Sequence, residues 1–169
     1  MRVAMRYNSY STPCQLFAYG EVEDYSLNVH CNLVTNTASQ GTGSLRWAIG
    51  CVSPGETISF TPSLEGDTIT LSTTTVVINT PLTIMSDMSD NIWIYGVTAP
   101  RAFEISASVT ATIHGLRIIG GTNADGSAIR NYGDLTLHSV ELFKHPGILD
   151  SKPLENPGTL TFQGANTIH

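Results

Sequence analysis

The sequence contains few charged residues. Charged side chains make up 13% of its 169 residues, about half of the share that is usual in globular proteins. The formal net charge is −6, and Lys and Arg form no cluster anywhere along the chain. Because nucleic-acid binding needs concentrated positive charge to contact phosphates, we expect no nucleic-acid partner.

Long apolar segments are also missing. No stretch approaches the ~20 consecutive apolar residues that a membrane-spanning helix needs, so we expect no membrane insertion by this chain. Met1 does not lead into the positively charged and then apolar segments of a signal peptide. The three cysteines, Cys14, Cys31 and Cys51, lack the close spacing of a metal site. The sequence leaves two alternatives for these cysteines, a Cys31–Cys51 disulfide or unpaired thiols.

Short strands dominate the sequence from Thr57 onward. They are three to five residues long and are separated by turn residues. The convincing helical turn is Ser44–Ile49, which we expect to end at Gly50 and the Pro54-Gly55 turn. The expected strands include Thr57–Phe60, Thr68–Leu71, Val76–Ile78, Leu82–Ile84 and Ile92–Tyr95.

An internal repeat predicts how these strands are arranged. The pattern of Leu82–Met85 recurs at Ala111–His114, Leu135–His138 and Leu160–Gln163. The units start about 25 residues apart, which fits one coil of a parallel β-helix with three short strands per coil. A β-sandwich is the alternative, but sandwiches do not produce repeats of this length in matched register. We therefore predict an all-β parallel solenoid.

Alternation within the repeat predicts which residues face the core. One set of apolar residues is expected inside: Leu82 and Ile84, Ala111 and Ile113, Leu135 and Leu137, and Leu160 and Phe162. The interleaved Thr83, Thr112, Thr136 and Thr161 are expected to form an outward ladder. His114 and His138 share one repeat position and should stack about 5 Å apart. Since Zn²⁺ needs three or four ligands, we interpret this pair as a solvent-facing ladder.

The first 31 residues carry a recognisable motif. Residues 17–29, Phe-Ala-Tyr-Gly-Glu-Val-Glu-Asp-Tyr-Ser-Leu-Asn-Val, resemble the closing signature of the GEVED domain, a small β-rich module of secreted bacterial proteins. The resemblance extends upstream through Arg2–Asn8 and Thr12–Cys14. It implies that 1–31 is the two-stranded C-terminal fragment of such a module, followed by a linker at 32–43. It further implies a secreted or cell-surface bacterial protein of which this chain is a fragment.

The acidic run within this motif is a candidate metal site. Glu21, Glu23 and Asp24 supply the oxygen ligands that Ca²⁺ prefers. Because alternation places Asp24 on the opposite strand face from the two glutamates, outward carboxylates are the favoured alternative. Apart from this calcium ion, we expect no cofactor.

A second resemblance covers roughly residues 33–140. It is carried by Asn36-Thr37, Gly43–Ile49 and Pro54–Phe60, which resemble the start of right-handed β-helix domains in bacterial surface proteins. These include choice-of-anchor proteins and relatives of polymorphic outer-membrane adhesins. The resemblance implies that 44–169 is a right-handed, incomplete parallel β-helix whose N-terminal end is capped by a short helix. Cys51 and Glu56 depart from the residues that are usual there.

Two aromatic side chains are the candidate ligand-binding residues. Trp93 and Tyr95 alternate with Ile92 and Ile94 on one expected strand. If both rings are exposed, they offer a stacking platform for sugars; burial beneath a loop is the alternative. We predict a structural or adhesive protein that binds a surface glycan or a protein, and expect self-association through the unpaired strand edges at the open end of the solenoid.

Enzymatic activity is not expected from this chain. Polysaccharide lyases and hydrolases share the parallel β-helix, but hydrolysis needs two carboxylates held across one face. The candidate acids are Glu104, Asp125, Asp134 and Glu141, which are scattered over different turns. The alternative function is therefore the non-catalytic N-terminal part of a carbohydrate-active β-helix enzyme.

Overall fold

The chain divides into two compact units, Met1–His30 and Cys31–His169. In the first unit, β1 (Arg2–Arg6) pairs antiparallel with β2 (Gly20–Asp24). These are the two strands expected from the sequence; the turn between them and the rest of the GEVED-like motif lie outside the described residues. The computed structural model describes residues 2–6, 20–24, 31–72, 74–87 and 89–169, the first two ranges as backbone only.

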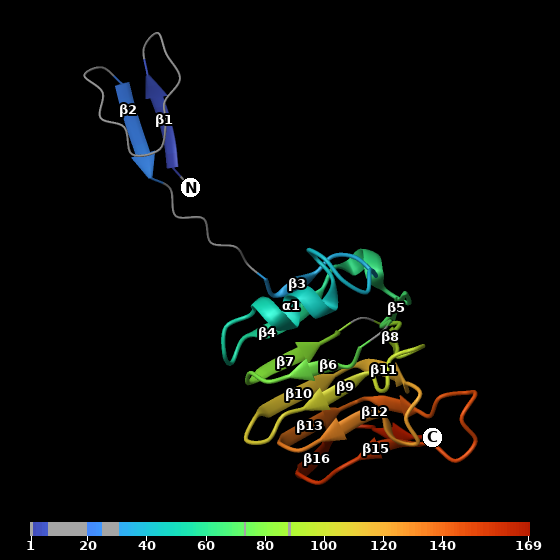
Figure 1. Ribbon diagram of the computed structural model, residues 1–169. Coiled ribbons are helices and arrows are strands. Elements are labelled where there is room, and N and C mark those ends of the chain that lie inside the picture. The colour runs from blue at the N-terminus through green and yellow to red at the C-terminus, as the bar shows by residue number, and fades with distance from the viewer. Residues whose placement is uncertain (1, 7–19, 25–30, 73, 88) are drawn as a thin grey trace. The chain divides into compact units, whose positions relative to one another are not determined.

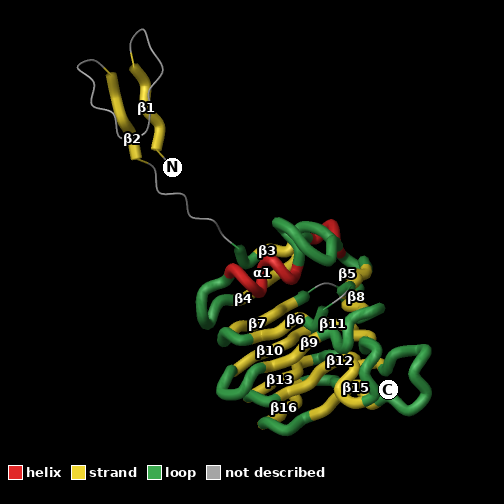
Figure 2. The backbone as a smooth tube through the Cα atoms, in the orientation of Figure 1, coloured by secondary structure: helices red, strands yellow, loops and turns green. Residues whose placement is uncertain are grey.

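The second unit is a parallel β-solenoid of about five turns (Figures 1 and 2). Sheet I contains β3 (Leu33–Val34), β4 (Thr57–Phe60), β7 (Leu82–Met85), β10 (Thr110–His114), β13 (Asp134–His138) and β16 (Thr159–Gln163). Sheet II contains β5 (Thr68–Thr70), β8 (Ile92–Tyr95), β11 (Leu116–Ile119), β14 (Glu141–Phe143) and β17 (Thr167–Ile168). Sheet III contains β6 (Val76–Ile78), β9 (Phe103–Ile105), β12 (Asp125–Asn131) and β15 (Lys152–Glu155). The predicted parallel solenoid is thus confirmed.

The repeat forms the register of sheet I. Ile84, Ile113 and Leu137 lie beside one another on neighbouring strands, and all are buried in the core. The ladder on the outer face contains one threonine more than the repeat indicated: Thr57, Thr83, Thr112, Thr136 and Thr161. Period-2 alternation therefore predicted the inner and outer faces of this sheet correctly.

One predicted core position is exposed. Phe162 lies in register beside Leu137, but half of its surface (50%) remains accessible. The reason is that β16, among the described strands, pairs with a neighbour on one side only, so Phe162 has an inward side chain beside it on that side alone.

A short helix covers the other end of the solenoid. The helix α1 (Leu45–Cys51) begins after Ser44, whose hydroxyl accepts a hydrogen bond from the Trp47 amide, as N-caps do. Its apolar face, formed by Leu45, Ala48 and Ile49, joins the core, and Figure 1 shows it beside β3 and β4. It continues through Gly50 to Cys51, beyond the expected end, because the Val52 amide still donates to the Ala48 carbonyl.

Arg46 ties this helix to the loops around it. Its guanidinium donates hydrogen bonds to the carbonyls of Ser39, Thr74 and Thr75.

The segment expected to be a linker, 32–43, contains a strand. This strand, β3, pairs with β4. A 3₁₀ turn, η1 (Pro62–Leu64), follows β4. No helix among the described residues is long and apolar enough to cross a membrane.

A disulfide joins Cys31 to Cys51, 20 residues apart in the sequence. It links Cys31, two residues before β3, to the last residue of α1. A cross-link over a loop of this length stabilises a fold by about 3 kcal/mol, chiefly by restricting the unfolded chain. We expect reduction to lower the free energy of unfolding in urea by about that amount. Cys31→Ser/Cys51→Ser should match the reduced wild type, whereas equal urea midpoints for oxidised and reduced protein would contradict this prediction.

The coil formed by β15, β16 and β17 has unpaired strand edges. Each of these strands has one neighbour, and Phe162 and Ile168 are exposed on them. Unpaired edges with apolar side chains favour association, so we expect the sedimentation coefficient to rise with protein concentration. Phe162→Lys should weaken this rise, whereas Leu149→Lys, at an exposed loop position, should not. A concentration-independent monomer would refute self-association.

Candidate functional site

The outer face of sheet II carries two rows of side chains. Trp93, Arg117 and Glu141 lie beside one another on β8, β11 and β14. In the second row, Tyr95 and Phe143 flank Ile119. We call this surface the aromatic face; it comprises Trp93, Tyr95, Arg117, Ile119, Glu141 and Phe143, with His145 and His169 in contact at its edge.

The rings on this face contact one another across the coils. The ring centroids of Trp93 and Phe143 lie 5.5 Å apart, and those of Tyr95 and His145 lie 6.2 Å apart. The His169 imidazole stacks on Phe143 with a centroid distance of 4.4 Å. These separations are typical of attractive aromatic pairs. Trp93 and Tyr95 are half-buried, because their neighbours cover them in part and leave the remaining ring surface to solvent.

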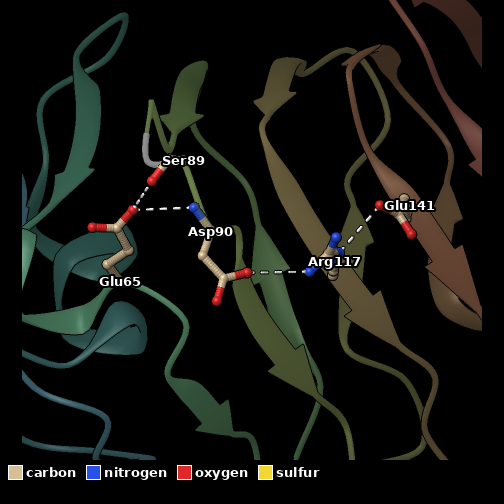
Figure 3. Close-up of polar contacts among 5 residues, drawn as sticks. All are labelled: Glu65, Ser89, Asp90, Arg117 and Glu141. Atoms are coloured by element: carbon tan, nitrogen blue, oxygen red, sulfur yellow. Dashed lines mark hydrogen bonds and ion pairs between the residues drawn. The ribbon is translucent and has the colours of Figure 1, made fainter.

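Arg117 is held in place by the carboxylates of Asp90 and Glu141 and by the ring of Trp93. Its Nε lies 3.1 Å from Oε1 of Glu141, and its Nη1 lies 3.4 Å from Oδ1 of Asp90 (Figure 3). The guanidinium carbon is 5.2 Å from the centroid of the Trp93 ring, within the range of a cation–π contact. Two carboxylates thus face one guanidinium, and the aromatic face carries no unpaired positive charge at this point.

Glu65 extends this polar network to the corner before β5. Its Oε1 accepts hydrogen bonds from the Ser89 hydroxyl and from the Asp90 amide, the latter at 3.1 Å (Figure 3). These bonds, that of Ser89 first, lower the pKa of Glu65 below its ordinary value of 4.5 because they favour the ionised form. The network therefore fixes the loop that leads into β8 and Trp93.

The lowered pKa of Glu65 predicts an acid-sensitive contact. A carboxyl whose pKa is lowered by folding stabilises the fold at any pH above its ordinary pKa. It loses that contribution as the pH falls through its pKa in the folded state. We expect the Glu65 carboxyl to titrate below 4.5 in an NMR pH titration. Ser89→Ala should move the midpoint up toward that value, since the Ser89 hydroxyl is the leading cause. A wild-type midpoint at or above the ordinary value would contradict the assignment.

The two predicted histidines do stack. The rings of His114 and His138 lie 4.3 Å apart and nearly parallel, at 12°. Nδ1 of His114 is 3.5 Å from Oδ1 of Asp87. Within the described part of the chain, no three His, Cys, Asp or Glu side chains are placed to hold a metal ion. The calcium prediction at Glu21, Glu23 and Asp24 stays a prediction, because the side chains of β2 lie outside the described structure.

The four candidate acids are spread over all three sheets, and two of them share sheet III. Glu104 is in sheet III, 2.7 Å from Nη1 of Arg101, and Asp125 begins β12 near Lys152. Asp134 lies in sheet I between Thr110 and Thr159, and Glu141 lies in sheet II.

Of the residues on the aromatic face, the sequence pattern singled out Trp93 and Tyr95 but not Arg117, Phe143 and His145. The sequence does contain a signal for Arg117 and Phe143. Ile92–Tyr95, Leu116–Ile119 and Glu141–Phe143 all alternate buried and half-buried residues. Aligning the middle strands of successive coils would have placed Arg117 and Phe143 beside the aromatic pair. His145 lies in an irregular loop and carries no such signal.

Comparisons with protein-family models, with curated proteins and with solved structures returned no match. A function for the aromatic face is therefore inferred from its geometry alone.

Proposed function

We propose that this protein binds a neutral glycan on the aromatic face and serves a structural or adhesive role outside the cell. The observation that carries the proposal is the contact of Trp93, Phe143 and Arg117 on one outward sheet face. Partly exposed aromatic rings present an apolar surface with polar neighbours, which suits the amphipathic faces of sugar rings. Arg117 and Glu141 supply hydrogen-bond donors and acceptors beside those rings.

The charges on this face favour a neutral ligand. Asp90 and Glu141 both pair with Arg117, so the carboxylates outnumber the guanidinium. An anionic sugar would have to displace one of them, and its charge would meet the other. Like charges across an interface oppose binding. Uronic-acid and sulfated glycans are therefore expected to bind more weakly than neutral ones.

The adhesive role and the extracellular location draw on other features. The GEVED-like motif at 17–29 resembles a module of secreted proteins. The solenoid stacks its coils through continuous parallel ladders, and such stacking makes a stiff support for a surface site. Detection of the protein on intact cells with an antibody against residues 31–169 would support this location. Recovery only from the cell interior would reject it.

The glycan proposal is tested with a panel of soluble hexasaccharides. Hexasaccharides of glucose, mannose and xylose represent neutral ligands, and hexagalacturonate represents an anionic one. Binding of at least one neutral probe, measured by calorimetry, is expected, with weaker or absent binding of hexagalacturonate. No binding to any neutral probe would overturn the proposal. Release of shorter sugars during the experiment would instead indicate catalysis by this chain, which would contradict both the adhesive role and the non-catalytic alternative.

A further inference from the structure

The aromatic face is longer along the solenoid axis than around the coil. It extends from β8 over β11 and β14 to the residue after β17, and these strands belong to four successive coils. Three strand spacings of about 4.8 Å each give it a length of roughly 14 Å. Around the coil, β8 presents two outward residues, Trp93 and Tyr95, which alternation places about 7 Å apart. A ligand that covers this face therefore has its long dimension along the axis.

The aromatic rings follow the same direction. The Trp93 ring on β8 contacts the Phe143 ring on β14, and the His169 ring directly after β17 stacks on Phe143. The ring planes in these two pairs differ by 33° and 5°, so the rings follow one another from coil to coil. A ligand along the axis touches all three in turn, whereas a ligand that runs around the coil reaches the ring of one coil.

Polar side chains form a parallel row beside these rings. Arg117, Glu141 and Thr167 lie beside one another in register on β11, β14 and β17. They present a guanidinium, a carboxylate and a hydroxyl on three successive coils, and sugar hydroxyls can donate to or accept from these groups. Each of the three coils therefore pairs one polar residue with one apolar or ring side chain of the second row.

The two rows are straight because the register of sheet II is uninterrupted. Its strands pair without a shift from β5 to β17, whereas β12 in sheet III shifts register between Asp125 and Ile129. In such a ladder, equivalent outward side chains align from strand to strand. A straight row fits an extended glycan, in which the sugars follow one another in a ribbon. A coiled glycan fits less well, because only some of its sugars reach the face.

We propose that the ligand of the aromatic face is an extended β-1,4-linked glycan, longer than a disaccharide, that lies along the solenoid axis. This inference rests on the proposed function, since it concerns the same face. Chains of β-1,4-linked glucose, mannose or xylose are ribbons with apolar ring faces and hydroxyl groups along their edges, whereas α-1,4-linked glucose forms a helix. The apolar faces suit the aromatic rings, and the edge hydroxyls suit the polar row.

The linkage is tested by calorimetry with the full chain. Cellohexaose, mannohexaose and xylohexaose carry β-1,4 linkages, and maltohexaose carries α-1,4 linkages. The tightest of the three β-1,4 ligands should bind at least about tenfold more tightly than maltohexaose. If none of the four binds, the proposed function and this inference fail together. If maltohexaose binds as tightly or more tightly, this inference fails alone and binding of a neutral glycan stands.

The direction of the ligand is tested with a length series and with one variant at the end of the face. The disaccharide of the tightest ligand should bind at least about tenfold more weakly than its tetrasaccharide, because it cannot span the row. His169→Ala removes the ring beside Phe143 at the β17 end and should weaken hexasaccharide binding about fivefold. His114→Ala removes an imidazole that stacks on His138 in sheet I and should leave binding unchanged.

Two results would overturn the orientation along the axis. The first is equal affinity of the disaccharide and the tetrasaccharide, because a ligand that crosses the coils gains contacts with length. The second is wild-type affinity of His169→Ala for the hexasaccharide, because the ligand would then not reach the coil of β17.

Discussion

Replacement of Trp93 by alanine is expected to weaken binding of the best neutral hexasaccharide by about thirtyfold. Central aromatic residues at binding sites typically contribute about 2 kcal/mol or more, which corresponds to a roughly thirtyfold loss of affinity. The change removes the ring that contacts Phe143 and the surface beneath the Arg117 guanidinium, so both neighbours also lose their support. Calorimetric titration of the wild type and the variant measures the effect.

The chain offers a matched control for this experiment. Tyr132 follows β12, is 38% exposed and lies under the guanidinium of Arg130 at 4.8 Å. It therefore repeats the pairing of arginine and aromatic ring away from sheet II. Tyr132→Ala should bind the hexasaccharide as the wild type does. Equal affinities for the wild type and Trp93→Ala would show that the hexasaccharide does not bind on the aromatic face.

Replacement of Ile113 by aspartate is expected to unfold the solenoid. Ile113 is fully buried, and its strand neighbours in register are Ile84 and Leu137. The variant loses the apolar contacts of a core side chain and places a carboxylate between two apolar side chains. A cavity and an unpaired buried charge together cost more than about 4 kcal/mol, a large share of the total stability of a domain.

Circular dichroism and urea unfolding measure this effect. Ile113→Asp should show no cooperative transition, whereas Ile113→Val should cost only about 0.5–1.5 kcal/mol. Thr112→Asp supplies a second control, because Thr112 is adjacent to Ile113 on the same strand but points to the outer ladder. The Thr112→Asp variant should therefore fold. If Ile113→Asp unfolded at the urea midpoint of the wild type, residue 113 would not lie in the core and the register of sheet I would be wrong.

The repeat made sheet I predictable. From β7 to β16 its strands keep one register, so equivalent residues such as Thr83 and Thr112 align from the sequence alone. The strand bounds of Thr57–Phe60 and Ile92–Tyr95 were likewise predicted as they occur. Alternation with period 2 and turn residues between short runs carry this information locally.

The aromatic face was less predictable because it depends on contacts between coils. Whether Trp93 is exposed depends on Phe143, two strands away, and on Arg117 between them. The position of His145 depends on an irregular loop. Similarly, cysteine spacing left the Cys31–Cys51 bond open, since only the packing of α1 beside β3 brings the two residues to a Cα separation of 5.5 Å. Neither the irregular loop at His145 nor the packing of α1 leaves a periodic pattern in the sequence.

The two tryptophans of the chain allow one direct measurement of glycan binding. Trp47 lies in α1, away from sheet II, and Trp93 lies on the aromatic face. Their indole N–H signals can be assigned with Trp47→Phe and followed while a neutral hexasaccharide is added. A binding site on the aromatic face predicts a saturable shift of the Trp93 signal and a constant Trp47 signal. A bound hexasaccharide that leaves the Trp93 signal unchanged would contradict it.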